Sequence, residues 1–183
     1  EKYRDWRLKQ NHSLSLGFIP TMGALHEGHS SLILKSKKLC DLTVVSIFIN
    51  PTQFNNKEDL ANYPSSNIED IELLQSLSVD ILFFPNPQKM YSHTFSTWVE
   101  EMKVSKPLEG AFRPKHFRGV ATIITKLFNV VQPTHAFFGQ KDIQQLKMVQ
   151  RLVYDLNYSI KIIPCQTVRN DKGLALSSRN QQL

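Results

Sequence analysis

The residues best suited to do chemistry stand together in one string, Pro-Thr-Met-Gly-Ala-Leu-His-Glu-Gly-His, at positions 20–29. His26 and His29 lie three residues apart on either side of Gly28, where an apolar run ends and a helix is expected to begin. A helix N-terminus has unpaired N–H groups and partial positive charge, so it attracts phosphate. The spacing places both imidazoles on one face, where they can donate hydrogen bonds to phosphate oxygens. A zinc-protease motif is excluded because Ser30 stands where its second histidine is required.

Two further strings suit a phosphate ligand. Ser177-Ser178-Arg179-Asn180 follows the last apolar run and the turn at 170–173. Its hydroxyls and guanidinium match phosphate oxygens, although such a string is also typical of a surface turn. In the segment 137–142, Gly139 permits close approach and Lys141 can serve as a mobile charge at the next helix start. Asp142 as a simple helix cap explains that segment equally well.

The elements that must position these residues follow from the hydrophobic pattern. Short apolar runs alternate with amphipathic segments, which predicts an α/β domain with an open parallel sheet and helices on both faces. Ligands bind such sheets outside the carboxyl ends of the strands. Ser66 and Glu69 predict a capping box, followed by an apolar stripe from Ile68 to Leu77. Strands are expected at 14–20, 42–49, 79–84, 95–99, 135–138 and 159–164, and helices at 3–11, 30–39, 119–131 and 142–156.

The composition limits the possible partners. The 183 residues suffice for one domain, and the net charge is +6 with a pI of about 9.3. An ordinary solvated surface and a polyanionic small molecule both fit this charge, whereas the scattered basic residues do not favour nucleic acid. No apolar stretch approaches the roughly 20 residues of a membrane span. Cys40 and Cys165 have no metal-binding spacing, so we expect reduced thiols and a cytoplasmic location.

Taken in order, these strings resemble the pantothenate synthetase (pantoate–β-alanine ligase) family. This family belongs to the nucleotidylyltransferase superfamily, which carries a HIGH-type histidine motif. The resemblance covers nearly all of the chain and is carried by residues 20–29, 48–54, 113–120, 137–146 and 167–180. It implies a Rossmann-like domain and a ligase that condenses (R)-pantoate with β-alanine through a pantoyl-adenylate, using ATP with Mg²⁺ and releasing AMP and pyrophosphate.

The resemblance also implies roles for individual residues. His29 is expected to act as the acid and His26 to assist at the phosphates, with Lys141 and Arg179 as the other catalytic residues. Gln53 is expected to contact pantoate and β-alanine, and Gln145 to contact pantoate. No protein side chain is assigned to a metal. The residues expected to bind ATP are Met22, Gly23, Ala24, Leu25, His26, Glu27, Gly28, His29, Gly139, Gln140, Lys141, Asp142, Val168, Leu176, Ser177, Ser178 and Arg179.

Two positions depart from the family pattern, which usually has Glu at Gln140 and Met at Leu176. Leu176 is close in volume and should be tolerated, whereas Gln140 removes one charge near the nucleotide.

The resemblance further implies a homodimer, no nucleic-acid or membrane partner, and a C-terminal lid domain that this chain lacks. Residues 1–183 are therefore expected to be the N-terminal ATP- and pantoate-binding domain of a longer protein. Two alternatives stay open. Another adenylyltransferase of the superfamily would keep the histidines but not Gln53 and Gln145, and a basic nucleic-acid-binding module would need clustered cations with exposed aromatics.

Overall fold

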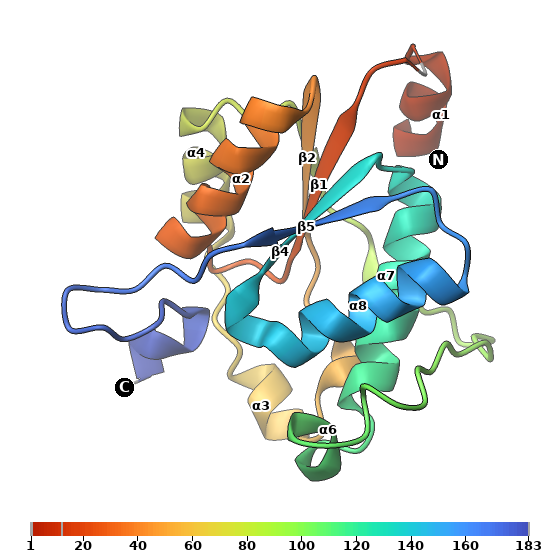
Figure 1. Ribbon diagram of the computed structural model, residues 1–183, viewed down its shortest axis with the longest axis vertical. Coiled ribbons are helices and arrows are strands. Elements are labelled where there is room, and N and C mark those ends of the chain that lie inside the picture. The colour runs from red at the N-terminus through yellow and green to blue at the C-terminus, as the bar shows by residue number, and fades with distance from the viewer. Residues whose placement is uncertain (1, 12, 183) are drawn as a thin grey trace.

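The computed structural model describes residues 2–11 and 13–182. Its centre is a five-stranded sheet in the order β3-β2-β1-β4-β5, and each neighbouring pair is parallel. The predicted open parallel sheet is therefore confirmed (Figure 1). The strands are β1 (Leu16–Thr21), β2 (Leu42–Ile47), β3 (Ile81–Phe83), β4 (His135–Gly139) and β5 (Lys161–Cys165).

Helices cover both faces of this sheet. The α-helices are α1 (Lys2–Lys9), α2 (Glu27–Leu39), α3 (Lys57–Ala61), α4 (Asn67–Ser76), α5 (Pro87–Met90), α6 (Glu109–Phe112), α7 (His116–Val131) and α8 (Ile143–Asp155). The short 3-10 helices of the described residues are η1 (Pro51–Gln53), η2 (Gln140–Asp142) and η3 (Ser178–Gln182). In Figure 1, α2 and α4 lie on one side of the sheet, and α7 and α8 lie on the other.

Successive side chains of each strand point to opposite faces of the sheet, which explains why helices cover both faces. In β1, Phe18 belongs to the larger core formed with α7 and α8, whereas its neighbour Ile19 belongs to the smaller core beneath α2 and α4. Val44 and Val45 of β2 divide in the same way. All four side chains are fully buried. Such continuous β-branched and aromatic runs are typical of central parallel strands buried on both faces.

Two local predictions are wrong. Residues 95–99 form no strand. The backbone N–H of Val99 instead donates to the hydroxyl of Thr122 on α7, 3.1 Å away, and the rings of Phe95 and Trp98 pack edge to face. The Thr122 side chain thus replaces a neighbouring strand as the hydrogen-bond partner of the Val99 backbone.

The Ser66–Glu69 capping box is also absent. Ser66 does stand at the N-cap of α4, but its hydroxyl donates to Asp70 at 3.3 Å and makes no cap hydrogen bond. The expected stripe is only partly buried, since Leu74 lies in the core while Ile68 and Ile71 are exposed.

Strand β1 begins two residues later than predicted and ends one residue later, at Thr21. Pro20 does not end it, because the pairing with β2 continues through Thr21. By this point β1 has lost its other neighbour, since its pairing with β4 covers only Gly17 and Phe18. A proline is tolerated in such an edge-like position.

Candidate active site

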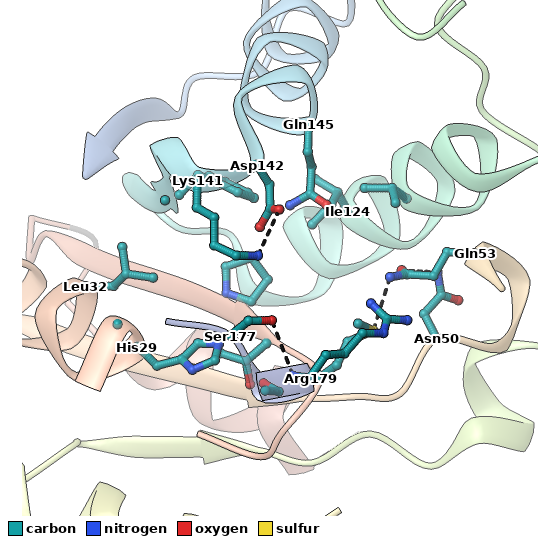
Figure 2. Close-up of a pocket in the computed structure, with 18 of the residues that line it drawn as sticks. His29, Leu32, Asn50, Gln53, Ile124, Lys141, Asp142, Gln145, Ser177 and Arg179 are labelled. Carbon is teal, nitrogen blue, oxygen red and sulfur yellow. Dashed lines mark hydrogen bonds and ion pairs between the residues drawn. The ribbon is translucent and has the colours of Figure 1, made fainter. Parts of the chain in front are cut away.

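A cavity of about 290 Å³ opens at the carboxyl ends of the strands. It lies where the chain order reverses, with β2 on one side of β1 and β4 on the other, which is the position that the sheet topology predicts for a ligand. Figure 2 shows side chains from α2, the β4–α8 connection and the C-terminal segment converging on this space. The predicted site residues in its lining are Met22, His26, Gly28, His29, Gln53, Gly139, Lys141, Asp142, Gln145, Val168, Leu176, Ser177, Ser178 and Arg179.

Five of the predicted ATP residues are not in that lining. They are Gly23, Ala24, Leu25, Glu27 and Gln140. Glu27 and Gln140 are exposed on the surface. The backbone N–H groups of Ala24 and Leu25 donate to the carboxylate of Asp70, so their hydrogen-bond partner lies on α4.

The two histidines cap helix α2. His26 is the N-cap residue, and its Nδ1 accepts a hydrogen bond from the Gly28 N–H at 3.1 Å. The Nδ1 of His29 accepts one from the His26 N–H at 3.3 Å. This is the reciprocal arrangement of a capping box, made here by two imidazoles. Because each Nδ1 is an acceptor, the ring proton of each histidine lies on Nε2.

Both rings are neutral at pH 7. Burial lowers the pKa of His29 to about 3, and the nearby His26 and Lys141 act in the same direction. Burial and Lys141 also lower the pKa of His26, against an opposing effect of Glu27. The ring centroids lie 4.2 Å apart, so two charged imidazoles would repel each other strongly. At neutral pH these residues can therefore offer Nε2–H hydrogen bonds from uncharged rings.

Two cations complete this end of the cavity, and each contacts a carboxylate. Lys141 Nζ lies 3.3 Å from Asp142, which makes no side-chain cap on α8. Arg179 contacts both carboxylate oxygens of Asp59, at 2.9 and 3.0 Å, and lies over the ring of Tyr63. These pairs are partly exposed, so each is weak enough to exchange for another anion.

Gln53 lies at the far side of the cavity on η1 and is held by its amide. Its Oε1 accepts from the side chain of Asn50 at 2.9 Å, and its Nε2 contacts the Met22 sulfur at 3.1 Å. Helix α7 packs directly against η1 at Gly119. A Cβ at this position would lie only 2.4 Å from the Thr52 carbonyl oxygen. Only glycine permits this approach, which fixes the position of Gln53.

Three polar residues near Gln53 were not predicted as site residues from the sequence: Glu109, Arg113 and His116. His116 Nδ1 donates to the Gln53 carbonyl oxygen at 2.9 Å, and Arg113 contacts Glu109 at 2.6 Å. All three side chains line the cavity, and burial lowers the pKa of His116. The segment 113–120 was noted for its resemblance, but nothing in its spacing assigned a role to these residues.

Within residues 2–11 and 13–182, no group of three or more His, Cys, Asp or Glu side chains is arranged to hold a metal ion. None of the helices described there is both long and apolar enough to cross a membrane.

Comparison with known proteins decides the family. The sequence profile described as Pantoate-beta-alanine ligase matches residues 1–183. The chain belongs to the pantoate-beta-alanine ligase family. Among curated members, the pantothenate synthetase of Thermosipho africanus (strain TCF52B) is 53% identical over 169 residues, covering 92% of this chain and 61% of that protein. The pantothenate synthetase of Buchnera aphidicola subsp. Acyrthosiphon pisum (strain Tuc7) is 53% identical over 183 residues, covering 99% and 64%.

Solved structures of the family agree with this assignment. The ligase of Francisella tularensis, complexed with beta-gamma ATP and beta-alanine, matches with a TM-score of 0.96 and 43% identity. The match covers 100% of this chain and 70% of that one. The pantothenate synthetase of Thermus thermophilus matches with a TM-score of 0.93 and 43% identity, covering 99% and 66%. This chain therefore spans less than two thirds of the length of the curated relatives described above.

Proposed function

We propose that this chain is the ATP- and pantoate-binding domain of a ligase that condenses (R)-pantoate with β-alanine to pantothenate. The observation that carries the proposal is the division of one cavity into two chemically different ends. One end offers neutral imidazole N–H groups, serine hydroxyls and two cations, which suit a triphosphate. The far side offers Gln53, and Gln145 also lines the cavity; the amides of both can donate to a carboxylate and accept from hydroxyls, as pantoate requires.

In the first step, a carboxylate oxygen of pantoate attacks the α-phosphorus of ATP. The bond between that phosphorus and the β-phosphate bridging oxygen breaks, and pyrophosphate leaves with the bonding electrons. Lys141 and Arg179 neutralise charge on the phosphates, while His26 and His29 donate Nε2–H hydrogen bonds as negative charge develops. The neutral state of His29 favours this role as a hydrogen-bond donor over that of a proton-releasing acid.

In the second step, the β-alanine amine attacks the acyl carbon of pantoyl-adenylate. AMP leaves with the electron pair of the acyl–oxygen bond, and the amine loses its proton as the amide forms. Gln53 would hold both substrates, with its own amide oriented by Asn50. No protein residue becomes covalently attached, so positioning supplies much of the rate enhancement.

The expected Mg²⁺ fits this site as a companion of ATP. The cavity lining contains carboxylates at Asp142 and Glu109, and the described part of the chain has no cluster that would form a protein cage, so the phosphates themselves would supply most ligands. Bound there, Mg²⁺ would neutralise phosphate charge. Asp142 would be a candidate ligand, since its carboxylate lies in the lining beside Lys141.

The remaining assignments stay predictions. The cavity lining supports ATP-binding roles for Met22, His26, Gly28, His29, Gly139, Lys141, Asp142, Val168, Leu176, Ser177, Ser178 and Arg179. The free thiols of Cys40 and Cys165 are compatible with a cytoplasmic enzyme. The homodimer and a C-terminal lid rest on the resemblance, and sedimentation of the full-length protein would test the dimer.

Mass spectrometry of a reaction with ATP, pantoate and β-alanine tests the proposal. Pantothenate or pantoyl-adenylate is the expected product. An adenylate formed only on a different acid would instead identify another adenylyltransferase of the superfamily, and the absence of any adenylate under all conditions would refute the proposal for this chain.

Calorimetry tests the pantoate end separately. Gln53→Ala should weaken pantoate binding about tenfold or more, because a hydrogen bond to a charged group contributes about 1.5–3 kcal/mol. ATP affinity should stay within about twofold of the wild-type value. Gln88→Ala, which removes an exposed glutamine outside the cavity, is the control. Lost ATP affinity with unchanged pantoate binding would contradict the assignment.

A further inference from the structure

Asp70 on α4 is a buried carboxylate that does not line the cavity. Its Oδ2 accepts from the Ala24 N–H at 2.9 Å, and its Oδ1 accepts from the Leu25 N–H at 2.7 Å. The Ser66 hydroxyl adds a third, longer hydrogen bond at 3.3 Å. No ion pair within residues 2–11 and 13–182 includes Asp70. Its charge is therefore stabilised by backbone N–H groups, which form strong charge-assisted hydrogen bonds.

The turn that Asp70 binds is in an unfavourable backbone conformation. Gly23 has φ +84° and Ala24 has φ +49°, so two successive residues lie in the left-handed region. Glycine adopts this region freely, but a residue with a Cβ does not. Such a conformation persists only where the surroundings over-determine it. The two hydrogen bonds to Asp70 provide that restraint on Ala24 and Leu25.

The same turn connects the two motifs at the phosphate end. Leu25 leads directly into His26, whose position as N-cap sets both imidazoles. On the other side, the Ala24 carbonyl oxygen accepts a hydrogen bond from the Ser178 hydroxyl at 2.9 Å. Ala24 is thus held by α4 through its N–H and by the segment that carries Arg179 through its carbonyl. A shift of Ala24 would therefore displace His26 and His29 together with the segment around Ser178.

We propose that Asp70 is a positioning residue for the phosphate end of the cavity. Through the left-handed turn at residues 23–25, Asp70 fixes the positions of His26 and His29. Through Ala24, it fixes the carbonyl oxygen that accepts the Ser178 hydrogen bond. The expected effect on ATP affinity rests on the proposed function, whereas the restraint of the turn by Asp70 does not. Asp70 itself contacts no substrate, so its effect should fall on ATP and not on pantoate.

The test compares Asp70→Asn with Asp80→Asn in this chain. Asn presents one oxygen and one NH₂ group, so one of the two backbone N–H groups must lose its acceptor. Asp80 is the matched control because its carboxylate also accepts a backbone N–H, that of Thr43 at 2.8 Å, but at the start of β2. Three quantities are measured: amide hydrogen exchange at Ala24 and Leu25, ATP affinity and pantoate affinity.

In Asp70→Asn, the amide that loses its acceptor should exchange at least about tenfold faster, and the ATP dissociation constant should rise about tenfold. Pantoate affinity should change by less than about twofold, and Asp80→Asn should alter none of the three. Unchanged exchange, unchanged ATP affinity, or an equal loss of pantoate affinity would each overturn the proposal. The last result would show that Asp70 holds the domain as a whole.

Two further outcomes are also decisive. If the wild-type chain binds no ATP, the proposed function fails in this chain, while the exchange rates at Ala24 and Leu25 still decide whether Asp70 holds the turn. If Asp70→Asn does not fold, Ser66→Ala perturbs the same carboxylate more gently. It should then raise amide exchange and the ATP dissociation constant by a smaller factor in the same direction, and no change in either would overturn the proposal.

Discussion

Replacing His29 by alanine should change the stability of the protein in opposite directions at neutral and acidic pH. At pH 7 the imidazole is neutral and its Nδ1 accepts the His26 N–H at 3.3 Å, so it helps to cap α2. Losing a cap costs about 1 kcal/mol. His29→Ala should therefore lower the free energy of unfolding at pH 7 by about that amount.

At acidic pH the sign reverses. The pKa of His29 falls from its ordinary 6.5 in the unfolded chain to about 3 in the folded protein. Below pH 6.5 the unfolded chain therefore binds a proton that the folded state excludes, and the wild type loses stability as the pH falls. At pH 5, about 1.5 units below the unfolded value, the loss reaches up to about 2 kcal/mol. Alanine escapes this loss, so the variant should be more stable than wild type by about 1 kcal/mol, with a crossover near pH 6.

Chemical denaturation at pH 7 and at pH 5 measures both differences. His26 is present in both proteins, so its own titration largely cancels in the comparison. His93→Ala is the control, because His93 is an exposed histidine outside the cavity. A His29→Ala variant that is destabilised equally at both pH values would refute the reasoning, because it would show that His29 is not held neutral by burial.

Two further predictions concern the two ends of the cavity. Gly119→Ala should lower the free energy of unfolding by about 1–3 kcal/mol in chemical denaturation, because its Cβ would lie 2.4 Å from the Thr52 carbonyl oxygen. Gly139→Ala, whose Cβ would meet no atom within 4 Å, should leave stability nearly unchanged, and equal losses in both would contradict the packing argument. Asp59→Asn should free Arg179 and strengthen ATP binding up to about fivefold at low salt. Calorimetry at rising ionic strength should show this gain disappear, and weaker ATP binding at low salt would refute the competition.

The sheet could be predicted from the sequence because its strands carry their own signal. The β-branched run in β2 and the apolar end of β4 are buried on both faces, so their hydrophobicity is continuous and easily recognised. The failed strand at 95–99 shows the limit of that signal. Phe95, Trp98 and Val99 favour a strand by propensity, but tertiary contacts with Thr122 decide their conformation.

Many residues of the cavity lining could be predicted from the sequence, but their hydrogen bonds could not. Helix α2 begins at Glu27, three residues before the predicted start, because two histidines cap it in place of the usual serine and glutamate. Asp70 was missed because its partners Ala24 and Leu25 lie 46 and 45 residues away in the sequence. A local pattern cannot reveal a hydrogen bond that depends on α4 packing beside the end of β1.

The phosphate end also shows how a cavity can suit a polyanion without carrying unbalanced charge. Lys141 and Arg179 each contact a carboxylate, and the two imidazoles are neutral, so the ligand-free site holds little net positive charge. Binding of a triphosphate would then be an exchange, in which phosphate oxygens replace Asp142 and Asp59 as the partners of the two cations. The released carboxylate of Asp142 would remain in the cavity lining beside the bound phosphates. Since exchange costs the existing ion pairs, affinity should come mainly from the fixed Nε2–H donors of His26 and His29. The restraint of the turn at residues 23–25 should therefore affect ATP binding more than the loss of either cation.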